Sequence, residues 1–505
     1  MTGHNMENVS PDTTPLRSIS HPFWTAPLWI ALFVLLACLL QWYISYPVDD
    51  DTAYHFTVGQ LIRKYGILQS FPWTPFSLQF DHYADKEFLF HLLFAPLGGL
   101  GFVTAARIVG ALGSALILSS LYLVLRAERV RHAGLWALLP LACSEFIFRI
   151  ALVRPHLLSI TLAILLLWAY ARERRGILAA VSVIFPLSYV AFWQIPLIII
   201  FSTETARLLS GERIRWKPAA IVVCGLAAGV ALHPNSLNLI GINWLHMSDI
   251  LFQGAWGARI DLNLGTEFAP FPPATWVKHL AVTVLCAGAA LILGWRERRN
   301  GFFPFACALT ALVFGLLTVR TLRFIEYFAP FTALAIALVS PGIRVKNAVF
   351  GICGVSLVYL LTLGTGPIRT LAPYPLDLKK EYIAPETARY FENTIPVGSQ
   401  VFTCGWDYTG NLMLALPERR FIVAADPTML YKKDPLLYGV WSQIPLLPPV
   451  DSAEQIRRNF NSRFVICLNY EAYWNFFDAL QASPGVRNLS SGKKWVLFDL
   501  GAERK

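Results

Sequence analysis

Three consecutive aspartates, Asp49, Asp50 and Asp51, directly follow the first long apolar stretch of this 505-residue chain. Adjacent like charges repel and raise one another's pKa, so they need solvent or a cationic partner. Two interpretations are open: a solvated acidic loop that only helps to set membrane topology, or a cluster that does chemistry. In the second, a carboxylate beside a substrate hydroxyl can serve as a general base, with Asp51 the first candidate and Asp49 the second.

The same stretch continues with other residues suited to binding. Clusters of oxygen ligands with one histidine suit a hard divalent cation, so Asp49, Asp51 and His55 are candidate ligands for Mg²⁺ or Mn²⁺. Carboxylates at both ends of one loop also suit the recognition of substrate hydroxyl groups. The candidate substrate-binding residues of this loop are Tyr54, His55, Asp85 and Glu87, with Asp81 near them.

Three arginines are candidate phosphate ligands. Arg154 precedes a proline after one apolar segment, and Arg320 and Arg323 lie between two others. The charge pattern of the loops predicts that all three face outward, against the usual retention of Lys and Arg on the cytoplasmic side. They either snorkel to the interface or hold a phosphate by paired hydrogen bonds. Because these arginines are expected to lie beside an acidic loop, we favour the binding of an anionic lipid headgroup.

Two further charged pairs have structural interpretations. Glu145 and Arg149 are four residues apart in one predicted helix and are expected to pair inside the membrane. Glu326 shares a helical face with Arg323 and is expected to orient it.

Membrane helices must position these residues. The chain is 55% hydrophobic and only 15% charged, against about 25% charged in soluble domains. A span needs roughly 20 apolar residues, and residues 88–100 are too short and too rich in Pro and Gly, so an interfacial helix is expected there. The eleven predicted spans lie near residues 27–46, 102–125, 133–152, 156–171, 176–192, 194–210, 218–232, 276–294, 302–319, 322–340 and 347–365.

The loop charges predict the orientation. Five short loops, near residues 126–131, 172–175, 212–217, 296–299 and 344–346, carry an excess of Lys and Arg and are cytoplasmic. The long loops 47–88, with six acidic and three basic residues, and 233–275, with three and one, are external. We therefore expect an integral protein of the cytoplasmic (inner) membrane with a cytoplasmic tail at residues 1–26. The net charge of +10 lies mostly in the cytoplasmic loops, so no nucleic-acid partner is expected.

Residues 368–505 are predicted to form an extracytoplasmic α/β domain. Apolar runs at 399–404, 420–425, 463–468 and 495–499 alternate with helical patterns near 380–393, 453–460 and 471–482. Gly405 and Gly410 form no nucleotide-binding motif and are interpreted as turn glycines. Cys404 and Cys467 end two of the predicted strands, where oxidation is possible, and whether they pair is left open.

With these residues in place, the chain resembles the GT-C superfamily of membrane glycosyltransferases. It looks most like bacterial multi-spanning members with a first-loop pattern D-x-D-x-W-W-H-L-x-x-G and a later W-x-x-H-E-W-L-F. The paired tryptophans are absent here, and Lys86 stands in the place of a histidine. The matching positions are Asp49, Asp51, Ala53, Tyr54, His55, Phe56 and Gly59, then Tyr83, Lys86, Glu87, Phe88, Leu89 and Phe90, then Arg154 and Pro155.

The resemblance implies a GT-C-like domain over residues 27–365 that binds a polyprenyl-phosphate-sugar donor. It implies inverting transfer to a glycan, lipid or protein acceptor on the outer face, with Asp51 or Asp49 acting on the acceptor hydroxyl. Arg154, Arg320 and Arg323 would stabilise the departing phosphate, and a divalent cation is optional. Two alternatives remain: a transporter or flippase of lipid-linked glycans, and an assembly partner that binds through residues 368–505.

Overall fold

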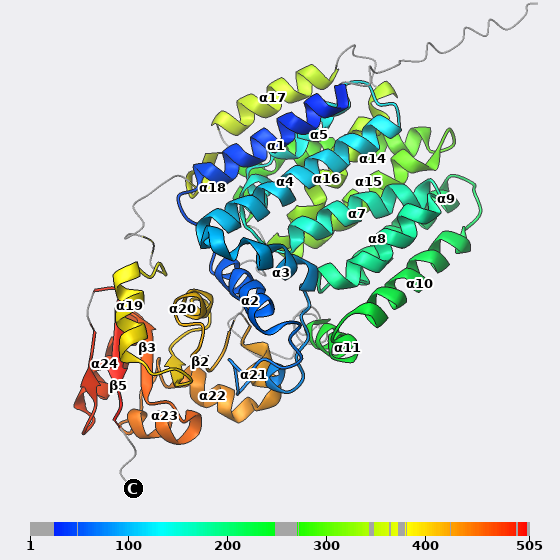
Figure 1. The fold of residues 1–505 in the computed structure, drawn as a ribbon. Coiled ribbons are helices and arrows are strands. Elements are labelled where there is room, and N and C mark those ends of the chain that lie inside the picture. Colours follow the sequence, from blue (N-terminus) through cyan, green and yellow to red (C-terminus); the bar gives the residue numbers. More distant parts are fainter. Residues whose placement is uncertain are drawn as a thin grey trace, which may run out of the picture.

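A helical body and a smaller domain of helices and strands make up the molecule (Figure 1). The computed structural model describes residues 25–47, 49–247, 270, 272–342, 348–362, 365–371, 379, 381–424, 426–490 and 493–501. Most of the predicted tail 1–26 and residues 248–269 of the second external loop lie outside these described residues.

Long apolar helices form the body because their sequences hold few charges over a membrane-length run. Within the described residues, four segments are each long and apolar enough to cross a membrane: α1 (Thr25–Tyr43), α4 (Phe102–Ala127), α15 (Phe302–Arg320) and Leu322–Val339, which joins η6 (Leu322–Phe324) to α16 (Ile325–Val339). The shorter helices of the body are α7 (His156–Ala171), α8 (Arg175–Ser188), α9 (Gln194–Leu209), α17 (Ala348–Thr362) and α18 (Thr365–Arg369).

Three further apolar helix pairs are bent. Counting each pair as one span raises the number in the described residues from four to seven. All eleven predicted segments contain an apolar helix, whereas the count of eleven spans stays a prediction. The bent pairs are α5 (Ala133–Leu138) with η3 (Leu139–Ala142) against α6 (Ser144–Ala151) at 91°, α10 (Trp216–Leu232) against α11 (Ser236–Leu245) at 115°, and α13 (Pro273–His279) against α14 (Ala281–Glu297) at 84°.

A buried ion pair joins α6 to α16 inside the body. Arg149 Nε donates to Glu326 Oε1 over 2.7 Å, and both side chains are almost fully buried. The predicted pairing of Arg149 with Glu145 is therefore wrong, since Glu145 instead lies 3.7 Å from His279 Nδ1. The bend between η3 and α6 turns Arg149 toward α16, which helical spacing alone does not reveal.

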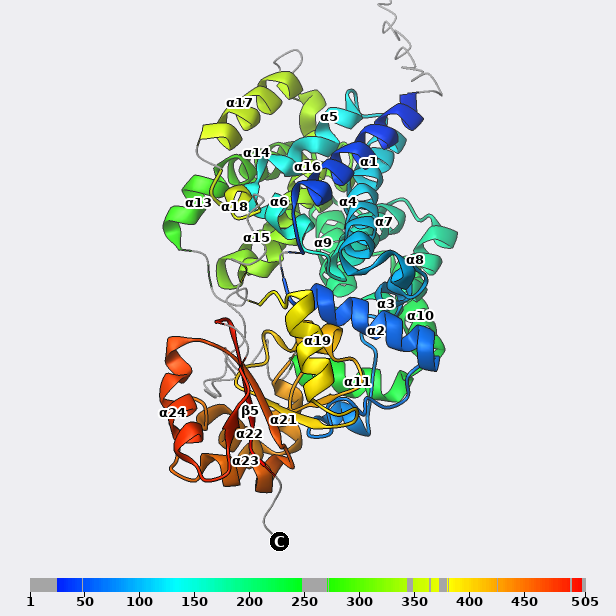
Figure 2. The same ribbon diagram turned by 60° about the vertical axis from the view of Figure 1, so that its left-hand side comes forward.

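The first external loop folds into helices that lie across the end of the body. Residues 47–88 contain α2 (Asp51–Tyr65) and η1 (Leu78–Phe80), and α3 (Phe88–Phe94) with η2 (Ala95–Leu100) follows. A helix is therefore present at the predicted residues 88–100, while its place at a membrane interface stays a prediction. Helix α2 packs closely on α3 at Gly59, where a Cβ atom would lie 2.7 Å from the His91 carbonyl oxygen. Figure 2 shows α2, α3 and α11 between the body and the C-terminal domain.

A mixed five-stranded sheet organises the C-terminal domain in the order β2-β1-β3-β5-β4. Strand β1 is parallel to β2 and β3, while β5 is antiparallel to β3 and β4. The four predicted strands are present, although the second is much shorter than predicted. The strands are β1 (Gln400–Thr403), β2 (Arg420–Phe421), β3 (Phe464–Leu468), β4 (Arg487–Asn488) and β5 (Trp495–Asp499), and the helices are α19 (Pro385–Thr394), α20 (Thr409–Ala415), α21 (Thr428–Lys433), α22 (Pro435–Gln443), α23 (Ser452–Phe460), η9 (Glu471–Tyr473) and α24 (Trp474–Ala482).

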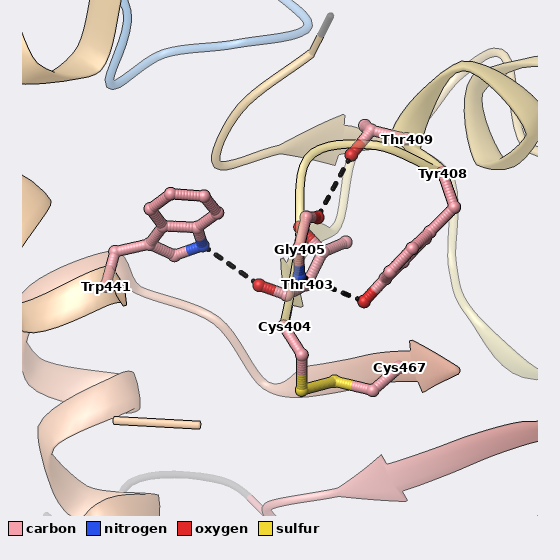
Figure 3. Close-up of a disulfide and its surroundings, with 7 residues drawn as sticks. All are labelled: Thr403, Cys404, Gly405, Tyr408, Thr409, Trp441 and Cys467. Carbon is pink, nitrogen blue, oxygen red and sulfur yellow. Dashed lines mark hydrogen bonds between the residues drawn. A yellow bond between two sulfur atoms is a disulfide. The ribbon is translucent and has the colours of Figure 1, made fainter. Parts of the chain in front are cut away.

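A disulfide between Cys404 and Cys467 ties the end of β1 to β3 (Figure 3). Hydrogen bonds hold the backbone on both sides of Cys404. After it, the Gly405 amide donates to the Tyr408 hydroxyl over 3.1 Å, and before it, the Thr403 carbonyl accepts from Trp441 Nε1 over 2.9 Å. Cys404 and Cys467, whose pairing the sequence left open, therefore form a disulfide. This disulfide fixes the turn that leads into α20.

Replacing Glu326 by alanine is expected to destabilise the protein by about 3–5 kcal/mol, because it leaves the Arg149 guanidinium buried without its counter-charge. Thermal unfolding in detergent, followed by tryptophan fluorescence, measures the loss. Leu316→Ala, at a position 63% exposed on α15, is the matched control and should change stability by less than about 0.5 kcal/mol. Equal effects of the two substitutions would contradict a structural role for the ion pair.

Candidate active site

Asp49 anchors the start of α2. The Thr52 amide donates to Asp49 Oδ1 over 3.0 Å, the Thr52 hydroxyl also donates to this oxygen, and Arg154 Nε donates to Oδ2. Burial alone would raise the pKa of Asp49, but the Arg154 charge and these hydrogen bonds outweigh it and hold the pKa below its usual value. With both oxygens engaged, Asp49 is better placed to hold the loop than to receive a proton.

Arg154 links two of the three aspartates. It lies in the break between α6 and α7, where Pro155 precedes the first residue of α7 and disfavours helical backbone before it. Besides Asp49, Arg154 contacts Asp51, whose Oδ2 lies 3.2 Å from Arg154 Nη2. The side chain of Asp51 is 33% exposed, whereas that of Asp49 is 11% exposed. Asp51 is therefore the more accessible carboxylate, in agreement with its first rank in the sequence analysis.

Asp50 is held by the C-terminal domain. The side-chain amide of Asn411, on α20, donates to Asp50 Oδ1. Gly410 allows this approach, since a Cβ atom there would lie 2.4 Å from the Asp50 carbonyl oxygen. Burial raises the pKa of Asp50 well above its usual value, and the nearby Lys379 opposes this only in part. Gly410 thus lies in α20 at a close contact, and its interpretation as a turn glycine is wrong.

A buried relay of His55, His91 and Asp85 lies beside the aspartates. His55 Nδ1 is 2.8 Å from His91 Nε2, and His91 Nδ1 is 2.6 Å from Asp85 Oδ1. Burial, reinforced by the positive charge that His91 carries when protonated, lowers the pKa of His55 well below its usual value. Since the Asp85 carboxylate accepts a hydrogen bond from His91 Nδ1–H, His91 Nε2 accepts and His55 Nδ1 donates. This tautomer leaves the basic nitrogen of His55 at Nε2.

His55, Glu87 and His91 form a candidate metal site. Their ligand atoms lie within 4.8 Å of one another, and all three residues are buried. This is the one such group among the described residues, so the set of Asp49, Asp51 and His55 is not gathered there. Arg154 instead supplies the positive charge between the two aspartates. His91 was missed in the sequence, although its spacing of four residues after Glu87 places both on one face of α3.

The remaining predicted binding residues lie around this relay or at the same end of the body. Tyr54 is buried, with its ring centroid 6.1 Å from that of His91. The Ser159 hydroxyl at the start of α7 lies 2.6 Å from the Tyr327 hydroxyl at the start of α16. This contact places η6, with half-buried Arg323, and the exposed end of α15 at Arg320, at the end of the body that carries Arg154.

A second junction joins the external loops to the C-terminal domain. His246, just after α11, has Nε2 3.0 Å from Asp426 Oδ2 and 3.3 Å from Lys86 Nζ. Burial would raise the pKa of Asp426, but His246 and Lys86 outweigh it and hold the pKa far below its usual value. Lys86 also lies 3.8 Å from Glu87. No sequence pattern indicates this contact, because Lys86 and Asp426 are 160 and 180 residues from His246.

Comparison with known proteins places this arrangement in a known fold. No protein-family model and no curated protein sequence matches the chain. Its structure is similar to that of ArnT from Cupriavidus metallidurans bound to undecaprenyl phosphate, with a TM-score of 0.59 and 12% identity over 96% of this chain and 99% of ArnT. Apo ArnT gives a TM-score of 0.57 at 12% identity, over 94% of this chain and 98% of that one.

A mycobacterial arabinofuranosyltransferase, AftD, shows the same likeness with a TM-score of 0.59 and 14% identity. The match covers 94% of this chain but 40% of AftD, so the chain spans less than half the length of that protein. At these identities the likeness shows the fold alone. The chain shares the fold of these proteins, which supports the predicted polytopic helical membrane protein with a small C-terminal sheet domain, while the number of spans stays a prediction.

The raised pKa of Asp50 makes a prediction about stability and pH. A carboxyl whose pKa is higher in the folded state contributes stability below its unfolded pKa and loses it as pH rises through the folded pKa. Asp50→Asn keeps an oxygen acceptor for Asn411 but removes the charge. At pH 7–8 it should raise the midpoint of thermal unfolding by about 1–3 °C, and the gain should shrink toward pH 4. A gain that is constant across this pH range would contradict the assignment.

Proposed function

We propose that the protein is a membrane glycosyltransferase that moves a sugar from a polyprenyl-phosphate donor to an acceptor on the outer face of the cytoplasmic membrane. The observation that carries the proposal is the accessible Asp51 carboxylate, paired with Arg154 at the end of a GT-C-fold body. A protein of this fold, ArnT, has been seen with undecaprenyl phosphate bound. The outward orientation follows from the charge pattern of the loops.

Asp51 is the proposed general base. The acceptor hydroxyl oxygen attacks the anomeric carbon while its proton passes to the Asp51 carboxylate. The bond from the anomeric carbon to the phosphate oxygen breaks, and the polyprenyl phosphate leaves with that electron pair. Attack on the face opposite the leaving group inverts the anomeric centre. Asp49 has a different part, because its contacts with Thr52 and Arg154 fix the backbone that presents Asp51.

Arg320 and Arg323 are proposed to bind the donor phosphate. Guanidinium groups pair well with phosphate oxygens, and both arginines lie at the end of the body that carries Asp51. Charge that grows on the leaving phosphate is stabilised by such preorganised donors. Arg154 adds a third positive charge to those of Arg320 and Arg323, while two of its nitrogens contact Asp49 and Asp51.

We further propose that a divalent cation binds His55, Glu87 and His91. Two imidazole nitrogens and one carboxylate are a donor set of catalytic zinc sites, whereas Mg²⁺ prefers oxygen ligands alone. Asp85 hydrogen-bonds His91 Nδ1, the contact that orients metal-binding histidines, so the cation would replace the hydrogen bond of His55 at His91 Nε2. The set therefore fits zinc better than the Mg²⁺ or Mn²⁺ expected from the sequence. A bound cation would join α2, which carries His55, to the start of α3, which carries Glu87 and His91.

Asp51→Asn should lower sugar transfer by about 10²–10⁴-fold, the usual contribution of a general base. Transfer is measured in proteoliposomes with undecaprenyl-phosphate-linked sugars, and thermal unfolding confirms that the variant is folded. Asp81→Asn is the matched control, since Asp81 lies in the same loop with a side chain 62% exposed. Full transfer by a protein with both Asp51 and Asp49 changed to asparagine would refute the proposal, and headgroup translocation without bond formation would favour a flippase.

The metal proposal predicts about one zinc per chain in full-length protein purified without chelators, as measured by mass spectrometry of the metal. His91→Ala should remove it, and Asp85→Asn should weaken zinc binding by about 10–100-fold, because Asp85 orients His91. His82→Ala, at an exposed histidine of the same loop, should keep the metal. Retention of zinc by His91→Ala would place the metal elsewhere.

A further inference from the structure

A cavity of about 410 Å³ lies between the C-terminal sheet and the first external loop, built from none of the residues assigned to sugar transfer. The first residues of three neighbouring parallel strands line it: Gln400 of β1, Arg420 of β2 and Phe464 of β3. Phe76 of the first external loop lines it from the other side. The volume falls in the range of about 300–1,000 Å³ that is usual for ligand sites.

The polar side chains of this cavity are hydrogen-bond donors. Gln400 Nε2 is buried and has no hydrogen-bond partner among the described residues, a state that costs free energy unless a ligand or water accepts its proton. Arg463, half-exposed, donates to Asp499 over 2.7 and 2.9 Å. Arg420 is exposed and, within the described part of the chain, its guanidinium forms no hydrogen bond or ion pair. No acidic residue lines the cavity.

Two backbone turns, at Gly398 and Asn461, border the cavity. Gly398 has φ +75°, a conformation that residues with a Cβ atom rarely adopt, and its amide donates to the Glu418 carbonyl over 2.9 Å. This turn brings the chain from α19 into β1 while Gln400 and Arg420 stay opposite each other on adjacent strands. Asn461 forms the third side, in the left-handed turn that ends α23.

Phe76 adds aromatic surface to this positive charge, because it is half-buried, whereas Phe460 and Phe464 behind it are 0% and 3% exposed. The rings of Phe76 and Phe460 pack edge to face with centroids 5.5 Å apart, and Phe464 lies beside Arg463. Aromatic faces suit the apolar face of a sugar ring, as they suit other flat apolar groups. The Arg420 guanidinium and a buried amide donor select an anion, and Arg463 adds the one terminal nitrogen that its pair with Asp499 leaves. A phosphate ion alone would leave the Phe76 ring without a packing partner.

We propose that this cavity binds an anionic carbohydrate unit, with the sugar ring against Phe76 and its carboxylate or phosphate on Arg420, Arg463 and Gln400. The site does not depend on the proposed transfer reaction. Because Phe76 belongs to the loop that carries Asp51, an occupied cavity joins that loop to the C-terminal domain. A glycan with acidic units would thereby be retained at the outer face.

Calorimetric titration of the full-length protein in nanodiscs tests the site with three probes: trigalacturonate, mannose 6-phosphate and neutral maltotriose. Binding of either anionic probe with maltotriose at least about tenfold weaker is expected, and the probe that binds identifies the anion. Equal binding of maltotriose, or no binding of either anionic probe, would overturn the proposal.

Variants then place the binding in the cavity. Arg420→Gln should weaken the bound probe by about tenfold or more, because it removes a charged donor, and Gln400→Leu should weaken it as well. Arg389→Gln, at an exposed arginine of α19 outside the cavity, should bind as the unchanged protein does. Since Arg420 is exposed, its variant should unfold at the same temperature. Unchanged affinity in Arg420→Gln would overturn the proposed location.

Discussion

Three adjacent carboxylates at the rim of an apolar body impose the constraint on which the rest of the structure depends. Left together in a buried setting, they would repel each other and protonate. The structure gives each a different environment: Arg154 and Thr52 engage Asp49, Asn411 engages Asp50, and Asp51 contacts Arg154 while staying the more accessible of the Arg154-bound pair. One residue is thereby left with the exposure that chemistry requires.

The three aspartates have different partners, and these partners come from distant parts of the chain that meet at the first external loop. The α6–α7 break supplies Arg154, and α20 supplies Asn411 from more than 350 positions away. Gly59 and Gly410 permit the close backbone approaches. The disulfide of Cys404 and Cys467 fixes the turn before α20 (Figure 3). The C-terminal domain therefore contributes to the geometry of the acidic loop.

Much of the fold was predictable because it depends on local composition. Apolar runs located the helices of the body, and short apolar runs located β1, β3 and β5. Residue type and position made the aspartates, His55, Glu87 and Arg154 candidates, and the structure brings Arg154 to Asp49 and Asp51 and His55 to Glu87. The partners of individual side chains were not predictable. Arg149 binds Glu326, and His91 completes the group of His55 and Glu87. Those contacts depend on helix bends and on the folding of the loop, which leave no periodic signal.

The most direct test of the central claim is an experimental structure of the protein in nanodiscs with undecaprenyl phosphate bound. We expect phosphate density within hydrogen-bond distance of Arg320 or Arg323, on the side that opens toward Asp51. The Asp51 carboxylate should face the position of the anomeric carbon from the side opposite the phosphate. Headgroup density remote from both arginines, or a phosphate from which Asp51 is separated by folded protein, would contradict the account.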